Sequence, residues 1–299
     1  MLDLTIIIIN FNTKDLTLAC LNSIYKSKPK LSFQIVVIDN ASKQDIKKDL
    51  KNKFPNVKFI KSNKNLGFAG GNNKVIRKIK GESKYYLLLN SDTKVFKGSL
   101  DALKNYAKEN EIGIASCKLT NPDGSFQPNA GRLPKPLPVF FWLSGLDDVL
   151  RFIVKLPSYQ ERNESYYEFD REVGWVSGSV MLIDEKVITT TGLLDEKIFM
   201  YCEDTDYCLR ATKDGFKVGW TKSTKIMHIG GASSVKARYI QWLGEFKGLL
   251  YLYKKHYNTF LMYLLKITLY IFIFIRVIAF YIVGKPENAK TYAKILKNL

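Results

Sequence analysis

Asp92 is the first residue of the chain whose type and setting could do chemistry. It closely follows the apolar run Tyr85–Leu89, and Asn90 stands two positions before it. An acidic residue at the end of a buried strand is well placed to bind a divalent cation through oxygen. Such a cation could neutralise the charge of a pyrophosphate leaving group. Asp92 could equally cap a helix or a turn.

His228 and the acidic segment Glu203–Asp206 are the next candidates. His228 precedes the Gly- and Ser-rich residues 229–234, whose backbone could approach phosphate oxygens closely. A lone histidine is, however, more often a packed or surface residue than a ligand. Three carboxylates crowd into Glu203–Asp206, which raises the pKa of at least one of them. A carboxylate poised near neutrality can act as a general base, although acidic residues also complement a helix dipole.

A mostly parallel sheet is expected to position these residues. In the first 120 residues, short apolar runs alternate with helical patterns, which is typical of βαβ units and a buried parallel sheet. In such sheets, ligands bind beyond the carboxyl ends of the strands. The expected strands are Ile6–Ile9, Ile35–Ile38, Val57–Ile60, Tyr85–Leu89 and Ile112–Ser116; the expected helices are Asp15–Tyr25, Gln44–Lys53, one from near Ala69, and Ser99–Lys108.

Four of these strands are followed by unusually polar residues. The polar segments are 10–12, 39–42, 62–65 and 90–92, rich in Asn, Asp and Ser. Each alone is an ordinary capping or turn signal. Together they predict a row of donors and acceptors along one edge of the sheet, called the polar rim below. The Gly-rich stretch Asn65–Asn73 runs into a helix and could bind an anion, but it is not the dinucleotide fingerprint.

The second half of the chain changes character twice. Prolines predict irregular structure over residues 121–172. Within it, the apolar stretch Val139–Leu156 is expected as a core helix or as a segment touching lipid or an apolar acceptor. Regular structure should resume at residues 173–183, 203–213 and 217–220. Phe260–Val283 is long enough to span a bilayer, but Lys266 and Arg276 favour an interfacial helix, a snorkelling helix or a hairpin partner.

Composition limits the classes of partner. Of the 299 residues, 46 are Lys or Arg and 28 are Asp or Glu, a net charge of +18. This charge favours anionic partners, although compositional bias supplies part of it. No interleaved aromatic and basic motif points to nucleic acid. The four cysteines form no CxxC pair, so neither a zinc site nor a disulfide framework is expected. No basic leader precedes the first apolar run, so the N-terminal domain is expected to stay in the cytoplasm.

The motifs in this order resemble family 2 glycosyltransferases of the GT-A fold, in particular the bacterial rhamnosyltransferase-like branch. The resemblance covers about residues 3–235, and its motifs in this sequence are residues 6–12, 36–42, 65–73, 88–92, Pro122–Gly124 with Gln127 and Arg132, 175–178, 201–210 and 228–233. It implies a GT-A domain over 1–235, with a nucleotide-binding half at 1–120 and an acceptor-binding half at 121–235. Residues 236–299 would form a helical, membrane-associating region.

The resemblance also implies roles for individual residues. Asp204 would be the catalytic base. The metal ligands for Mn²⁺ or Mg²⁺ would be Asp92 and His228, although Asn90 replaces the first Asp of the family's DxD motif. The donor-binding residues would be Asn10, Phe11, Asp39, Gly67, Asn72, Asn73 and Asn90, and the acceptor-binding residues would be Trp175, Gly178 and Glu203.

The expected activity is inverting transfer of a sugar from a nucleoside-diphosphate donor, either dTDP-rhamnose or a UDP-hexose, to a hydroxyl. The expected acceptor is a polyprenyl-diphosphate-linked saccharide in cell-surface polysaccharide synthesis, and the expected location is the cytoplasmic face of a bacterial membrane. Two rival interpretations remain. A sugar nucleotidyltransferase would usually carry a basic Gly-rich loop after the first strand, where Asn10–Thr13 stands instead. A non-catalytic membrane scaffold would not need the polar rim.

Overall fold

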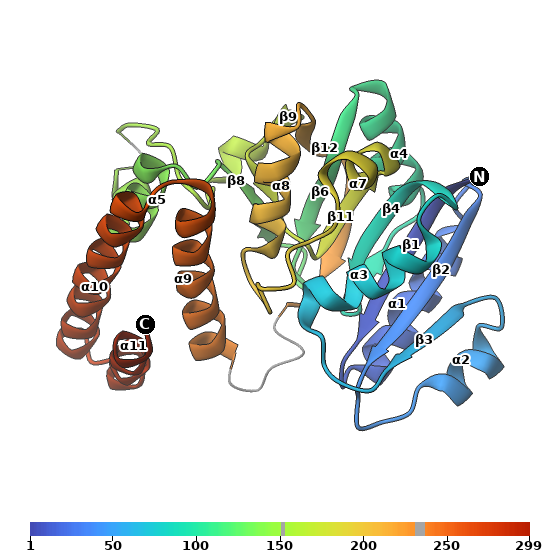
Figure 1. Ribbon diagram of the computed structural model, residues 1–299, viewed down its shortest axis with the longest axis horizontal. Coiled ribbons are helices and arrows are strands. Elements are labelled where there is room, and N and C mark those ends of the chain that lie inside the picture. Colours follow the sequence, from blue (N-terminus) through green and yellow to red (C-terminus); the bar gives the residue numbers. More distant parts are fainter. Residues whose placement is uncertain (151–152, 231–236) are drawn as a thin grey trace. The chain divides into compact units, whose positions relative to one another are not determined.

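The computed structural model describes residues 1–150, 153–230 and 237–299 (Figure 1). Within these ranges the chain forms two compact units. Unit 1 comprises residues 1–131, 160–199 and 203–233, and unit 2 comprises residues 132–159, 200–202 and 234–299. Unit 2 therefore joins the C-terminal helices to residues 132–159, which the division predicted from the sequence had kept with the first domain.

Unit 1 is built on a mixed, mostly parallel sheet. Strands β1 (Leu2–Asn10), β2 (Phe33–Asn40), β3 (Lys58–Ser62) and β4 (Ser83–Asn90) are parallel and lie in the order β3-β2-β1-β4. The pairs Asn10↔Asp39 and Ile9↔Asn90 are in register. The polar residues that follow these strands therefore meet along one edge, as the sequence predicted.

The sheet continues beyond β4 with a reversal that the sequence did not predict. Strand β11 (Val180–Asp184) runs antiparallel between β4 and β6 (Ile112–Thr120), and β12 (Lys217–His228) is parallel to β6. Strand β5 (Thr93–Val95) pairs with the end of β12. Because β11 runs backwards, the residues that precede it lie beside the end of β4, on the polar rim.

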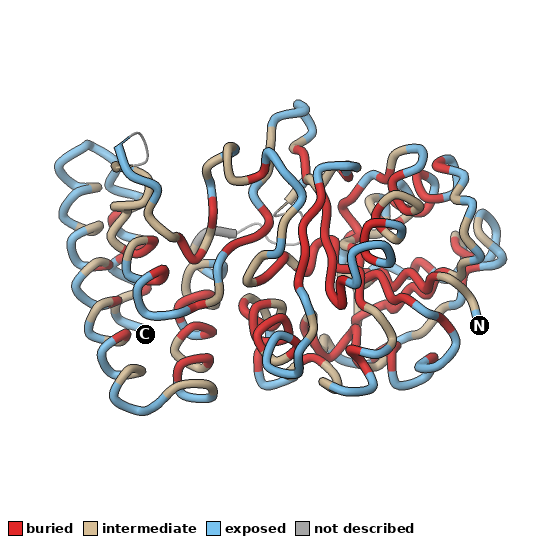
Figure 2. Tube along the Cα trace, turned by 90° about the horizontal axis from the view of Figure 1, so that it is seen from above, coloured by how far each residue is buried: buried red, intermediate tan, exposed pale blue. Residues whose placement is uncertain are grey.

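Helices cover both faces of this sheet. Alternate strand residues such as Leu4, Ile6 and Ile8 share a buried core with α1 (Lys14–Ser27), α2 (Lys47–Lys53) and α4 (Ser99–Glu109). The opposite face contacts α3 (Gly67–Ile79) and α7 (Glu185–Thr191), and α8 (Glu203–Lys213) contacts β6, β10 and β12. Continuous apolar strands are required because both faces are buried, and Figure 2 shows buried residues running along them.

Residues 121–172 contain short elements where irregular structure was expected. Apart from the two helices described below, these are β7 (Phe126–Gln127), β8 (Ala130–Gly131), a 3-10 helix η1 (Glu164–Tyr167) and β9 (Arg171–Glu172). The stretch expected as one regular run at 173–183 is divided into β10 (Trp175–Val176) and β11. Strands of two or three residues carry too few side chains to show a period in the sequence.

Unit 2 is helical. It contains α5 (Pro136–Ser144), α6 (Leu146–Val149), α9 (Ala237–His256), α10 (Thr259–Ile282) and α11 (Pro286–Asn298). The single core helix expected over Val139–Leu156 is wrong, because Gly145 adopts φ 74 and separates α5 from α6. Of these two helices, only α5 contributes buried residues. Among the described residues, α10 is the one helix long and apolar enough to cross a membrane.

Candidate active site

The part of the polar rim that was predicted to bind the donor contains a network of buried hydrogen bonds. Asn10 is fully buried at the end of β1, and its Nδ2 donates to Asp39 Oδ1 at 2.7 Å and to Ser42 Oγ at 3.0 Å. Its Oδ1 accepts from Thr17 Oγ1 at 2.9 Å. Asn10 thus lies beneath the rim and positions Asp39, while Phe11 follows it in a half-buried position.

The Gly-rich stretch forms the first turns of α3. The helix begins at Gly67, two residues earlier than expected. Gly67 has φ +70, and a Cβ there would lie 2.3 Å from the backbone oxygen of Phe199, so no side chain fits. Asn40 anchors the preceding turn, because its Oδ1 accepts from Leu66 N at 3.0 Å and its Nδ2 donates to Gly67 O at 3.1 Å.

Asn72 and Asn73 point into the protein rather than along the rim. Asn72 Nδ2 donates to Phe68 O at 3.1 Å within the helix. Asn73 is fully buried and exchanges two hydrogen bonds with the backbone of Leu194, at 2.8 and 3.1 Å. Its Nδ2 also donates to Glu196 Oε1 at 2.9 Å. These side chains therefore attach α3 to its surroundings, and contact with a donor through them stays a prediction.

The predicted metal ligands lie together beyond β4 and β12. His228 Nε2 is 3.3 Å from Asp92 Oδ1 and 3.3 Å from Asn90 Nδ2. Asp92 Oδ2 accepts from Gly230 N at 3.1 Å. Burial alone would raise the pKa of Asp92, but the hydrogen bond and charge of His228 outweigh it and lower the pKa. Residues 231–234 of the Gly- and Ser-rich segment lie outside the described residues.

The predicted base, Asp204, lies in the first turn of α8. Its Oδ2 accepts from Gly178 N at 3.0 Å, and its Oδ1 accepts from Thr205 N at 2.7 Å. Burial raises the pKa of Asp204, and these hydrogen bonds offset part of the rise. Gly178 connects this carboxylate to the donor side, because the next residue, Ser179, accepts a hydrogen bond from Asn90 N at 2.9 Å.

Glu203 directly precedes this base in the sequence, and Trp175 is a second residue predicted to bind the acceptor; both are buried. Burial, followed by the charge of Asp204, raises the pKa of Glu203 well above its usual value. Within the described part of the chain, no group hydrogen-bonds to Glu203 Oε2. Trp175 lies in β10, which pairs with β8. The two acidic neighbours are therefore distinct, one held by backbone N–H groups and one with a buried, unsatisfied oxygen.

The sequence was compared with models of known protein families. The sequence model described as glycosyl transferase family 2 matches residues 5–154, which include the ends of β1, β2 and β4. The chain belongs to glycosyl transferase family 2. The GT-A-like fold and the rhamnosyltransferase-like resemblance predicted from the sequence are confirmed by this match and by the relatives and solved structure described next.

This family 2 chain is similar to two relatives of known name and to one solved structure. It is 28% identical over 206 residues to the N-acetylglucosaminyl-diphospho-decaprenol L-rhamnosyltransferase of Mycobacterium tuberculosis, covering 65% of this chain and 66% of that protein. It is 26% identical over 230 residues to a low-salt glycan biosynthesis hexosyltransferase of Haloferax volcanii, covering 76% and 67%. A mannosyltransferase from Pyrobaculum calidifontis in complex with GDP-Man and Mn²⁺ superposes with a TM-score of 0.57 at 15% identity, covering 85% of this chain and 64% of that one.

The residues around Asp92 fit a divalent cation of the kind family 2 enzymes are expected to use. Among the described residues, no three His, Cys, Asp or Glu side chains cluster as a complete metal cage. Asp92 and His228 would therefore supply two ligands, with Asn90 adjacent. Mg²⁺ characteristically binds through one or two protein carboxylates and completes its shell with phosphate oxygens and water. Such a sparse donor set suits a cation that arrives with a diphosphate.

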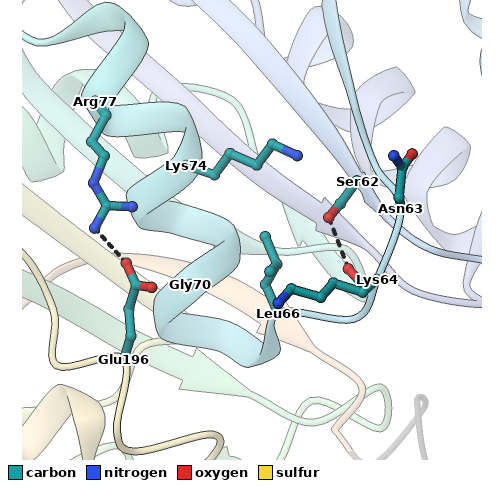
Figure 3. Close-up of a pocket in the computed structure, with 8 residues that line it drawn as sticks. All are labelled: Ser62, Asn63, Lys64, Leu66, Gly70, Lys74, Arg77 and Glu196. Atoms are coloured by element: carbon teal, nitrogen blue, oxygen red, sulfur yellow. Dashed lines mark hydrogen bonds and ion pairs between the residues drawn. The ribbon is translucent and has the colours of Figure 1, made fainter.

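A surface cleft lies along α3 and the segment that precedes it (Figure 3). It has a volume of about 540 Å³ and is lined by Ser62, Asn63, Lys64, Leu66, Gly70, Lys74, Arg77 and Glu196. Two of these lining residues, Arg77 and Glu196, form an ion pair. None of the residues predicted to bind the donor or the metal lines this cleft, except that Gly70 belongs to the Gly-rich stretch.

Several supporting residues were not among the predicted site residues. Thr17 and Ser42 hold Asn10, Gly230 holds Asp92, and Gln127 hydrogen-bonds to His228 through Nδ1 at 2.8 Å. Gln127 was visible only as part of the Pro122–Gly124 motif, with no role attached. Its partner is 101 residues away in the sequence, so no local spacing could have revealed the contact.

Proposed function

We propose that the protein transfers a sugar from a nucleoside-diphosphate donor to the hydroxyl of a lipid-linked saccharide, with inversion at the anomeric carbon. The observation that carries this proposal is the placement of Asp204 and of the Asp92–His228 pair on one rim of one sheet. The pair would hold the diphosphate through a divalent cation, which would neutralise the charge of the leaving group. Asp39, positioned by Asn10, would hydrogen-bond to a pyrimidine base.

The transfer step is proposed to use Asp204 as the base. Asp204 accepts the proton of the acceptor hydroxyl. The hydroxyl oxygen forms a bond to the anomeric carbon while the bond from that carbon to the diphosphate oxygen breaks, and the electron pair leaves with the diphosphate. A single displacement inverts the carbon. A double displacement, which retains the configuration, would need a second carboxylate as nucleophile, whereas the single displacement needs none.

The donor is proposed as dTDP-rhamnose or a UDP-hexose. The two relatives, an L-rhamnosyltransferase and a hexosyltransferase, support both. The test is calorimetric binding of dTDP and UDP, each with and without Mn²⁺, to the full chain. We expect metal-dependent binding of one of them, and weak binding of both by the Asp92→Ala variant. If neither binds to folded protein, a non-catalytic scaffold becomes the better interpretation.

Unit 2 is proposed to bind the cytoplasmic surface of the membrane that carries the acceptor. Leu265, Leu269 and Ile273 form the buried side of α10. The other side exposes large apolar residues at helical spacing: Phe260, Tyr263, Leu264, Ile267, Ile271, Phe274, Ile275, Ile278 and Ile282. An exposed apolar stripe of this length marks an interaction site rather than ordinary surface.

The helices that pack on α10 favour an orientation in the plane of the membrane. Helix α11 contacts α10 and carries Lys290, Lys294 and Lys297. If α10 crossed the bilayer, α11 would bring these charges into the hydrocarbon, which is costly. The two internal cations of α10 need no lipid contact. Arg276 donates to Leu143 O at 2.6 Å within unit 2, and Lys266 lies 5.8 Å from the ring of Tyr270.

Labelling of single cysteines tests this orientation. Asn258→Cys and Lys285→Cys flank α10, and we expect both to react with an impermeant maleimide from the cytoplasmic side only. Labelling of Lys285→Cys from the opposite side would show that α10 spans the membrane. Flotation with anionic vesicles gives a second readout, which an Ile271→Glu/Ile275→Glu variant should lose while it still binds nucleotide.

A further inference from the structure

Gln127 makes a hydrogen bond that the proposed chemistry has not yet used. Its Oε1 lies 2.8 Å from Nδ1 of His228. The opposite ring nitrogen, Nε2, faces Asp92 Oδ1 at 3.3 Å. Neutral imidazole carries one proton, on either nitrogen, and only the nitrogen without it can bind a metal. The orientation of the Gln127 amide therefore decides whether Nδ1 must carry a proton. If it must, Nε2 is the nitrogen of the neutral ring that can bind a metal.

The amide orientation is fixed by a chain of hydrogen bonds that begins at a carboxylate. Asp123 can only accept, so Ser125 Oγ must donate to Asp123 Oδ1, at 2.6 Å. Ser125 Oγ then accepts from Asn121 Nδ2 at 2.9 Å. The remaining Asn121 Oδ1 accepts from Gln127 Nε2 at 3.0 Å. Gln127 Oε1 is thus left to accept from His228, whose proton must be on Nδ1.

Two backbone carbonyls impose the same orientation, since they also only accept. Asn121 Nδ2 donates to Phe126 O at 3.4 Å, and Gln127 Nε2 donates to the carbonyl of His228 itself at 3.5 Å. Turning either amide would place oxygen against oxygen. The ionised state of Asp123 is supported by the side chain and N–H of Ser125, which lower its pKa. The direction of every hydrogen bond in the chain is therefore determined.

We propose that Gln127 is a positioning residue that holds a proton on Nδ1 of His228, so that Nε2, the nitrogen beside Asp92, is the one left to bind a metal. The Pro122–Ser125 turn acts as the anchor of this arrangement. The proposal rests on the metal site of the proposed function and adds the reason why that site contains a ligating histidine in the correct tautomer. Partners of this kind on the second nitrogen of a ligating histidine typically change metal affinity 10- to 100-fold.

The tautomer can be measured directly, because the chain contains only two histidines. The full chain labelled with ¹⁵N-histidine gives long-range ¹H–¹⁵N correlations that distinguish a proton on Nδ1 from one on Nε2, and a His256→Ala variant assigns the spectrum. We expect Nδ1 of His228 to carry a proton without any metal, both when the ring is neutral and when it is protonated on both nitrogens. A neutral ring with its one proton on Nε2 in the unsubstituted protein would overturn the proposal, whatever the protein does with metal.

Two substitutions then test the consequence for metal. Gln127→Leu keeps the size but removes the acceptor, and we expect Mn²⁺ affinity, read by electron paramagnetic resonance, to fall about 10- to 100-fold. Gln127→Glu keeps an acceptor and should bind Mn²⁺ at least as tightly as the parent. Lys118→Ala, a change at a partly exposed side chain of the neighbouring strand β6, is the matched control and should leave affinity unchanged.

The outcomes separate this proposal from the proposed function. Unchanged Mn²⁺ affinity in folded Gln127→Leu would overturn the positioning role while leaving the transferase proposal intact. If the parent protein binds no Mn²⁺, the metal part of the proposed function fails, and the positioning role is then decided by the tautomer alone: a His228 proton that leaves Nδ1 in Gln127→Leu but stays there in Gln127→Glu supports it.

Discussion

Asp92 and Asp204 are carboxylates at one edge of the same sheet, and their surroundings move their pKa in opposite directions. At Asp92, His228 and the N–H of Gly230 overcome burial and keep the carboxylate ionised. At Asp204, burial dominates over the N–H groups of Gly178 and Thr205 and raises the pKa. A pair of carboxylates separated in this way can divide the work between a fixed negative charge and a proton acceptor.

The largest expected effect comes from removing the proton acceptor. Asp204→Asn should lower kcat at least about 100-fold, as is usual for loss of a general base, because an amide cannot take the proton of the acceptor hydroxyl. Donor binding, measured by calorimetry, should stay unchanged. Asp214→Asn, an exposed change just beyond the same helix, is the charge-matched control. Normal turnover by Asp204→Asn would remove the residue from this role.

The fixed charge is tested by Asp92→Asn. The variant should bind the nucleotide at least about tenfold more weakly in the presence of Mn²⁺, since even changes to the partners of a metal ligand cost that much. Binding without metal should change little. If the ratio of affinities with and without Mn²⁺ stays at the parent value, Asp92 does not hold a cation and the contrast with Asp204 has another cause.

The connection between the two sides is tested at Gly178. A Cβ on this residue would lie 2.7 Å from Cζ of Phe68 in the first turn of α3. Gly178→Ala should therefore cost about 1–3 kcal/mol of unfolding free energy, as overpacking does, and should lower kcat by displacing the N–H that holds Asp204. Thermal unfolding and initial rates measure both. Phe68→Leu in the same chain should restore part of the stability; no restoration would contradict the steric explanation.

The smallest effect is expected at Glu203, and it depends on pH. The pKa of Glu203 is higher in the folded protein than in the unfolded chain. Below the unfolded-state pKa the residue is protonated in both states and does not lower the free energy of unfolding. As the pH rises toward the folded-state pKa, the unfolded chain ionises more readily, and the free energy of unfolding falls. Glu203→Gln should therefore raise Tm at pH 8 by a few degrees, about 2–4 °C per kcal/mol, and change it little at pH 4. An equal shift at both values would show that ionisation is not the cause.

The sequence predicted the donor half of the fold better than the acceptor half. Strands β1, β2 and β4 are continuous apolar runs because both faces of the sheet are covered, and such runs are visible in any sequence. The antiparallel β11 has the same composition, so its direction depends on tertiary pairing with Leu89 and Leu88 rather than on local pattern. The sequence predicted that Gly145 lies within one helix over Val139–Leu156. The composition of this stretch does not reveal that Gly145 has a positive φ and ends α5.

The candidate site shows the same division. Asp39, Asp92 and Asp204 follow recognisable signals: the ends of apolar runs and the start of a helical pattern. The orienting contacts join residues far apart in the sequence, such as Asn10 with Asp39 and Gln127 with His228. Asn73 was expected at the donor because it lies in a family motif, but its side chain is occupied by Leu194 and Glu196, which only the tertiary structure could reveal.

The contact that holds Asp204 has an evolutionary consequence. It comes from the main-chain N–H of Gly178, and apart from the introduction of proline no substitution can delete a main-chain donor. The network around Asn10 and Asp39 is built from side chains and can be lost at each of its positions separately. Apart from Gly178 itself, where a Cβ would meet Phe68, sequence drift should therefore be tolerated more readily around the base than at Asn10 and its partners. New acceptors can therefore be accommodated by exchanging side chains around Asp204, while the main-chain N–H of Gly178 continues to hold the base.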